Sequence, residues 1–532
     1  MKVKIPLLLF LCSTLFIIAY KTPLSTSCKN QISDESLLSS LKMPLDSLSI
    51  RLLLQKTWSN IAKKYSANQF WGDLLQKASS KKSACKTNPT LNIDNKPLNL
   101  AITKTLPLPA KEIQITVFVH GIMSIKPHLS ISNFIRFMFD KVNNTVYSRT
   151  VNSMRKNSFF ENNQVMQGLG LEKITFNKCS ASSTFARLIK EINEWEAPQN
   201  PAIQRSYYTY GWAGLLSSSQ RYIDAIGLYQ SLTDLVEKYK KQGIKTSLRL
   251  IGYSHGGNVC LNMAAANLLE PISKKSLSID ELILIGMPVQ SETDYFINDP
   301  MFKKIYHIYS RGDRIQQLDF FSTKRFFSKQ IFKKRKNFNL PKKLIQIKIK
   351  VTRKTHRKKA LPSTYNMNKK SFLYGHTQNL RDISPGHIEL WFFGWTPANY
   401  RQNYLMNPLP TASFLPLIIN CAEKFKKQSL EPEESQSIII DLRPEFESII
   451  VKNQGSSKNI ATFKFPKPAM IERMKELSYK CAPKSYSLSK YNSHIDDAYI
   501  KSRNIYRSHY TKKHRPCRRK RSNICFQPAL IL

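Results

Sequence analysis

The stretch LRLIGYSHGGNVC, residues 248–260, joins an apolar run to a Gly-x-Ser-x-Gly-Gly sequence. The apolar run predicts a buried strand, and the small residues at 262–266 predict a helix after it. Gly252 and Gly256 lack a Cβ, so strand and helix can approach closely while Ser254 is held in a strained conformation that pushes its hydroxyl outward. The stretch therefore predicts a strand, a sharp turn and a helix, with Ser254 as a candidate nucleophile. Taken alone, it also fits an ordinary strand-to-helix turn.

A serine nucleophile needs a base to take its proton and a third group to orient that base. Asp313 follows the apolar segment 304–309 and a turn-forming glycine, which suits an orienting carboxylate at the end of a strand. His387 lies on a Ser-Pro-Gly turn directly before the apolar segment 388–395, which suits a base carried on a loop over the serine. His376 is the alternative base, but no comparable segment follows it.

Upstream, residues 113–119 form another apolar strand pattern, closed by His120-Gly121-Ile122. In serine hydrolases, the turn after such a strand supplies one backbone N–H for the oxyanion, and the residue after the nucleophile supplies the other. Here these donors would be Ile122 and His255. A single His-Gly pair is otherwise an ordinary loop start, so the prediction depends on finding all four features in this order.

The stretches 118–122, 252–257, 309–313 and 386–387 together resemble a lipase or esterase of the serine α/β-hydrolase superfamily. The resemblance covers about residues 112–425. Within it, the chain is similar to bacterial lipases in having a His-Gly-Ile turn after the oxyanion strand. It implies an α/β fold with a mostly parallel sheet flanked by helices. It also implies Ser254 as nucleophile, His387 as general base and then acid, and Asp313 as the group that orients the imidazole. Long insertions depart from the family pattern and leave the substrate class open.

Composition bounds the remaining functions. The chain has 532 residues and a formal charge of +46, from 82 Lys and Arg against 36 Asp and Glu. Such a charge favours acidic lipid headgroups or nucleic acid as partners, although a general bias toward lysine would also raise it. The sequence contains no phosphate-binding loop and no His-Glu-x-x-His metal motif, so we expect neither a cofactor nor a metal.

The two ends of the chain differ from its middle. Residues 1–20 carry two lysines and then an apolar run, which predicts a signal peptide or signal anchor and therefore export. Residues 21–105 predict a helical region and a linker. Residues 426–500 predict a small β-containing appendage, or strands that extend the main sheet, and 501–532 predict a basic tail. Of nine cysteines, Cys12 lies in the apolar run, and the other eight are compatible with disulfides whose pairing the sequence leaves open.

The predicted hydrolase core, 106–425, contains two insertions. Residues 123–205 are a candidate cap with apolar residues at 159–160 and 165–166, and a surface loop is the alternative. Residues 320–381 contain no Asp or Glu and mix many basic residues with phenylalanines. Within them, 344–351 alternates like a strand with one cationic face. This composition favours docking on an anionic membrane, with nucleic-acid binding and a merely solvated insertion as alternatives.

The sequence thus predicts an exported serine ester hydrolase that acts on a carboxylic ester, most simply that of a lipid. Two alternatives stay open. The same triad could hydrolyse amides or thioesters, or the fold could be a catalytically idle scaffold that binds anionic membranes or nucleic acid.

Overall fold

The structure is a computed structural model. It describes residues 112–123, 140, 142–196, 203–269, 277–317, 328–336, 338–352, 376–379, 382–395, 404, 406–428, 436–455, 460–482 and 488–513. The predicted signal segment 1–20 and the helical region 21–105 lie outside these residues. No helix in the described ranges is both long enough and apolar enough to cross a membrane.

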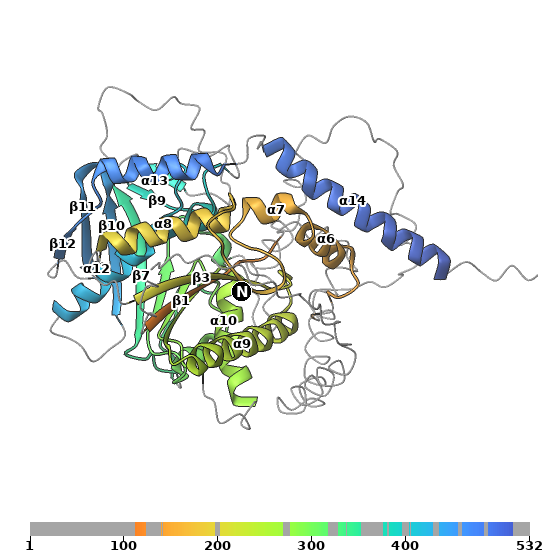
Figure 1. The fold of residues 1–532 in the computed structure, drawn as a ribbon, viewed down its shortest axis with the longest axis horizontal. Helices are drawn as coiled ribbons and strands as arrows, with labels where there is room; N and C mark the ends of the chain where they lie inside the picture. Colours follow the sequence, from red (N-terminus) through yellow and green to blue (C-terminus); the bar gives the residue numbers. More distant parts are fainter. Residues whose placement is uncertain are drawn as a thin grey trace, which may run out of the picture. The chain divides into compact units, whose positions relative to one another are not determined.

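One mixed, mostly parallel sheet runs through the described part of the chain (Figure 1). Its strand order is β12-β11-β10-β7-β6-β5-β4-β1-β3-β2, with β9 pairing beside β7 and β8 pairing with β9. The pairs from β3 through β1, β4, β5, β6 and β7 to β10 are parallel, whereas β2, β11 and β12 are antiparallel to their neighbours. The strands are β1 (Glu112–Val119), β2 (Gly170–Lys173), β3 (Ile203–Gly211), β4 (Lys245–Tyr253), β5 (Glu281–Ile285), β6 (Ile305–Tyr309), β7 (Leu344–Thr352), β8 (His376–Asn379), β9 (Asp382–Ser384), β10 (Gln436–Arg443), β11 (Ser448–Asn453) and β12 (Ile460–Lys464).

Helices pack on both faces of this sheet because successive side chains of each strand point to opposite sides. In β1, Ile115 and Val117 join the core under α9 and α10, whereas Phe118 joins the core under α8, α11, α12 and α13. The helices are α6 (Val146–Arg155), α7 (Ser158–Asn163), α8 (Ala181–Glu196), α9 (Ser218–Lys241), α10 (His255–Leu269), α11 (His387–Trp391), α12 (Leu415–Gln428), α13 (Pro468–Lys480) and α14 (Leu488–Lys513). The predicted α/β architecture is therefore confirmed.

The structure resolves one alternative that the sequence left open and adds two findings about the basic insertion. Strands β10 to β12 extend the main sheet, the second alternative for 426–500, because β10 pairs in parallel with β7. Strand β7, placed in the basic insertion 320–381, lies inside the sheet between β6 and β10. The first part of the basic insertion carries phenylalanines at 320, 321, 326, 327 and 332, which docking on a membrane would expose. Phe332 is instead buried in the core, and the other four lie outside the described residues.

The segment 123–205 is not a single cap. Strand β2 pairs with β3 at the sheet edge, and α8 packs on the sheet as part of its helical cover. Helices α6 and α7 instead share a separate apolar cluster with α14, which includes Phe160 and Ile495. Residues 501–513, expected to begin a basic tail, continue α14 to Lys513.

Phe185 on α8 tests this packing. Its fully buried ring meets Phe118 of β1 at 5.2 Å and Trp391 of α11 at 4.9 Å between ring centroids. We expect Phe185→Ala to lower the free energy of unfolding by about 3 to 5 kcal/mol, because it leaves a cavity between sheet and helices. Urea denaturation would measure the change. The matched control is Leu169→Ala, whose side chain is 70% exposed and whose loss should cost less than about 0.5 kcal/mol.

Candidate active site

Ser254 occupies the turn between β4 and α10, as the sequence predicted. Its φ is 52°, in the left-handed region that costs a non-glycine residue roughly 1–2 kcal/mol. Its N–H donates to the Ile285 carbonyl at 2.8 Å, and its carbonyl accepts from the Gly257 N–H at 3.0 Å. These bonds hold the strained residue between the neighbouring strand and the first turn of the helix.

The glycines on either side of Ser254 make this turn sterically allowed. A Cβ at Gly256 would lie 2.3 Å from the His120 carbonyl oxygen, and a Cβ at Gly252 would lie 2.7 Å from the Gly257 Cα. Real Cβ atoms do not approach other atoms so closely, so the β1 turn, the strand and the helix can meet only with glycine at both positions.

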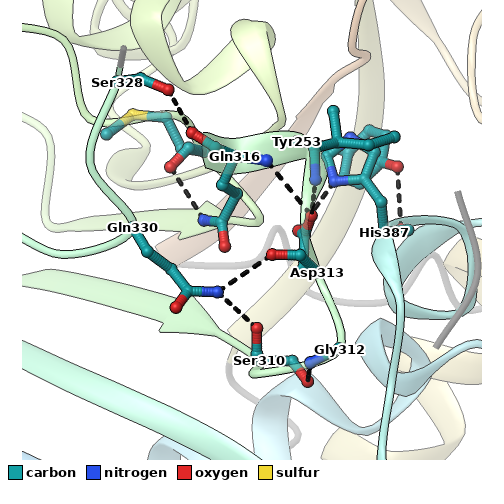
Figure 2. A network of polar contacts seen from close by, with 10 residues as sticks. Tyr253, Ser310, Gly312, Asp313, Gln316, Ser328, Gln330 and His387 are labelled. Atoms are coloured by element: carbon teal, nitrogen blue, oxygen red, sulfur yellow. Dashed lines mark hydrogen bonds and ion pairs between the residues drawn. The ribbon is translucent and has the colours of Figure 1, made fainter. Parts of the chain in front are cut away.

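Asp313 and His387 form a buried pair at the carboxyl ends of the parallel strands, where Ser254 also lies (Figure 2). The His387 Nδ1 lies 2.8 Å from Asp313 Oδ2, and the two side chains are 5% and 0% exposed. The other carboxylate oxygen, Oδ1, accepts from the backbone N–H groups of Ile315 at 3.1 Å and Gln316 at 3.4 Å. A carboxylate only accepts, so the imidazole proton sits on Nδ1 and the lone pair on Nε2 remains available as a base.

Strand register brings this pair next to the serine. Tyr253 and Ile285 are paired residues of β4 and β5, so Ser254 and Gly286 follow at neighbouring strand ends. A Cβ at Gly286 would lie 2.9 Å from Asp313 Oδ2 and 3.3 Å from His387 Nδ1. In addition, the Tyr253 hydroxyl donates to the His387 carbonyl at 2.9 Å. The three residues predicted as a triad thus lie close together at the carboxyl ends of the central strands.

The structure does not include a hydrogen bond between the Ser254 hydroxyl and His387 among the described residues. Such contacts in unliganded active sites are often long and tighten when substrate binds. His376, the alternative base, lies on β8, where its backbone pairs with Ser384. Its side chain lies outside the described set.

The turn after β1 lies against the serine. A Cβ at Gly121 would come within 3.0 Å of the Ser254 Cβ, so the residue before Ile122 packs directly against the serine. His255 is the first residue of α10, so its N–H stands at the positive end of that helix. Burial, reinforced by the nearby Arg221 charge, lowers the pKa of the His255 side chain well below its usual value. That imidazole is therefore neutral at pH 7.

Arg155 stabilises the turn after β1, and the sequence did not identify it as part of the site. Its guanidinium donates to His120 Nε2 at 2.9 Å and to the Gly168 carbonyl at 3.0 Å. Arginine only donates, so Nε2 of His120 is unprotonated and Nδ1 carries the proton that it donates to the Gly121 carbonyl at 2.6 Å. Burial and the Arg155 charge lower the pKa of His120 well below its usual value, which agrees with a neutral ring. Arg155 thereby holds the turn that carries Ile122.

Trp212 holds the same turn from the other side. Its indole N–H donates to the His120 carbonyl at 2.6 Å, and its ring stacks on the imidazole at 5.6 Å between centroids. From the sequence, Trp212 was expected at the end of a strand, in a segment at 211–214 that could line the pocket. Nothing in the sequence marks Arg155, which sits in the polar segment expected to be a cap.

Comparison of the sequence with protein-family models and with curated proteins gave no match. The interpretation of the site therefore depends on its geometry and on the motifs.

Asp224 of α9 makes the stability of the fold depend on pH. It accepts from the Ala213 N–H at 3.3 Å, and burial raises the pKa of its carboxyl from 3.8 to about 6, although the Arg155 charge acts in the opposite direction. The folded state thus holds this proton more tightly than the unfolded chain, so the group lowers stability as pH rises from about 4 through 6.

We expect Asp224→Asn to remove this cost. Between pH 4 and pH 7.5 the wild type loses stability through Asp224, and the variant does not. The stability advantage of the variant over the wild type, measured as the free energy of unfolding, should therefore be about 2 to 3 kcal/mol larger at pH 7.5 than at pH 4. Urea denaturation of both proteins at the two pH values measures it. A difference that does not change with pH would show that Asp224 is ionised in the fold as readily as in the unfolded chain.

Proposed function

We propose that this protein is a serine hydrolase of the α/β-hydrolase fold that cleaves carboxylic esters, with lipid esters as its substrate class. The observation that carries the proposal is the strained Ser254 turn beside the buried Asp313–His387 pair. A positive φ at a serine between a strand and a helix is the conformation that a nucleophile elbow requires.

In this mechanism, Ser254 attacks the substrate carbonyl while His387 Nε2 takes its hydroxyl proton. Asp313 accepts from the Nδ1–H of His387 and so keeps the ring oriented and its positive charge stabilised. The backbone N–H groups of Ile122 and His255 would bind the oxyanion of the tetrahedral intermediate. His387 then protonates the departing alcohol, and a water activated by the same histidine hydrolyses the acyl-enzyme.

The lipid-ester substrate class follows from the resemblance of the motifs to lipases. Met123, Leu215 and Leu216 are buried in the apolar cluster of α6, α7 and α14, and Ile122 packs against this cluster while remaining partly exposed. Ile122 thus offers an acyl chain one apolar contact at the oxyanion turn. Amide and thioester hydrolysis use the same triad, so turnover of matched ester, thioester and amide substrates separates these activities.

Labelling by a fluorophosphonate tests the nucleophile. We expect the wild type to react covalently and Ser254→Ala and His387→Ala to lose labelling, with kcat/KM for a short acyl ester reduced by at least about 10⁴-fold. Asp313→Asn should reduce it by roughly 10³- to 10⁴-fold, because the imidazole loses its orienting carboxylate.

His376→Ala is the matched control and should keep both labelling and turnover. Circular dichroism would check that each variant is folded. A folded wild-type protein that neither labels nor turns over any ester, thioester or amide would contradict the proposal and favour an idle scaffold.

We further propose that an anionic membrane surface is a partner, since a cationic face lies near the site. This cationic face comprises Arg311, Lys348, Lys350 and Lys452. Lys348 of β7 and Lys452 of β11 are both paired with Ile439 of the intervening β10, so they lie on the same side of the sheet. Partial burial and the charges of the other three cations lower the pKa of Lys348. Arg311 is exposed and precedes Asp313 by two residues, so this face adjoins the site.

Asp441 of β10 is paired with Lys350, so this face carries the four named cations beside one carboxylate. Each basic residue near an acidic bilayer contributes about 1 kcal/mol. Export would bring the protein to such a surface, but that proposal depends on residues 1–20, which the structure does not describe.

Sedimentation with vesicles of 30% phosphatidylserine tests the membrane proposal. We expect Lys348→Glu/Lys452→Glu to weaken binding by at least about 10-fold, whereas Lys467→Glu, an exposed residue at the start of α13, should change it little. Unchanged vesicle binding in the double variant would contradict a role for the cationic face. Loss of oligonucleotide binding instead would favour nucleic acid as the partner.

A further inference from the structure

Two cysteines far apart in the sequence lie side by side. Cys179 precedes α8 in the turn after β2, and Cys481 caps the C-terminus of α13. Their sulfur atoms are 3.1 Å apart, although 302 residues separate them in the chain. A disulfide bond is about 2.05 Å long, so a shift of about 1 Å would allow one to form.

The two thiols differ in accessibility. Cys179 is exposed, whereas Cys481 is buried beneath it. The other described cysteines, Cys260 and Cys421, are both buried, and within the described ranges neither makes a sulfur–sulfur contact. Burial raises the pKa of both these thiols, that of Cys421 to about 12. Among the four cysteines that the structure describes, the 179–481 pair alone combines an accessible thiol with a second thiol in reach.

We propose that Cys179 and Cys481 form a disulfide in an oxidising compartment. The exposed Cys179, as its thiolate, attacks one sulfur of a glutathione-type disulfide and releases one glutathione thiolate. Cys481 then loses its proton and attacks the Cys179 sulfur of this mixed disulfide, which releases the second glutathione thiolate. One protein S–S bond forms, the two protein thiols are oxidised by two electrons, and the oxidant is reduced to two thiols that take up the two protons.

Hydrogen bonding to Cys481 raises the pKa of the Cys179 thiol. Its thiolate is consequently scarce at neutral pH, and the uncatalysed reaction should be faster at alkaline pH.

The cross-link would join α8 to α13. Both helices cover the same face of the sheet as α11. The ion pair between Arg473 of α13 and Glu191 of α8, at 3.2 Å, already joins them. Helix α8 in turn carries Phe185, which packs on Trp391 of α11, the helix that begins with His387. Closing so long a loop restricts the unfolded chain, so the disulfide stabilises the fold without taking part in the proposed hydrolysis.

The experiment uses the full chain incubated with oxidised glutathione at pH 8.5. Peptide mapping by mass spectrometry without reductant should show a linked pair of peptides containing Cys179 and Cys481, lost after dithiothreitol. Oxidation should also raise the Tm by roughly 5 °C. Both thiols remaining free to alkylation after oxidation, or either one linked to another cysteine, would overturn the proposal.

Cys179→Ser removes the accessible thiol without disturbing the core. In this variant we expect the Tm difference between oxidised and reduced protein to shrink by the same roughly 5 °C. The control Asn177→Ser, at a neighbouring exposed position, should keep the full difference. An undiminished difference in Cys179→Ser would show that another bond is responsible.

Discussion

The candidate site depends on how closely three backbone segments approach one another at the carboxyl ends of the central strands. The turn after β1, the end of β4 and the start of α10 meet where a Cβ at Gly256 would overlap the His120 carbonyl. This close approach fixes Ser254 in its left-handed conformation and places it beside Gly121. The strain is local, and it persists because the bonds to Ile285 and Gly257 and the packing of both sheet faces leave the serine no relaxed alternative.

Hydrogen bonds among the buried polar groups at these strand ends determine which nitrogen of each imidazole carries the proton. Arg155 can only donate, which determines the tautomer of His120 and hence the bond to the Gly121 carbonyl. Asp313 as a carboxylate can only accept, which determines the tautomer of His387 in the same way. Both imidazoles therefore have one defined proton position, although one lies in the turn after β1 and the other at the start of α11. The bonds that these groups make favour a single geometry. The network is not fully satisfied, because Arg155 Nε is buried without a hydrogen-bond partner in the described part of the chain.

The sequence predicted the parts of this site that depend on local chemistry. Gly252 and Gly256 around Ser254, and the apolar strands before Ser254 and Asp313, follow from rules of period and turn geometry, and the structure gathers the predicted residues at one edge. The rest depends on contacts between distant segments. Arg155 lies on a helix without any motif, and its role arises only where α6 passes the β1 turn. The alternation at 344–351 predicted a strand with one cationic face, and Ile347 and Ile349 do point into the core. The basic run around this strand nevertheless suggested an insertion, because its pairing with β6 and β10 depends on segments distant in the sequence.

Tyr253 shows how one strand can position both the serine and the histidine. Alternation along β4 sends Ile251 and Tyr253 to the same face, under α11, where the Tyr253 ring stacks on Trp391 with an interplanar angle of 4°. Its hydroxyl also binds the carbonyl of His387 at the start of that helix. The next residue, Ser254, leaves the alternation through its positive φ. A displacement of β4 would consequently move the nucleophile and the anchor of its base together, so their relative position is protected from small shifts of the sheet.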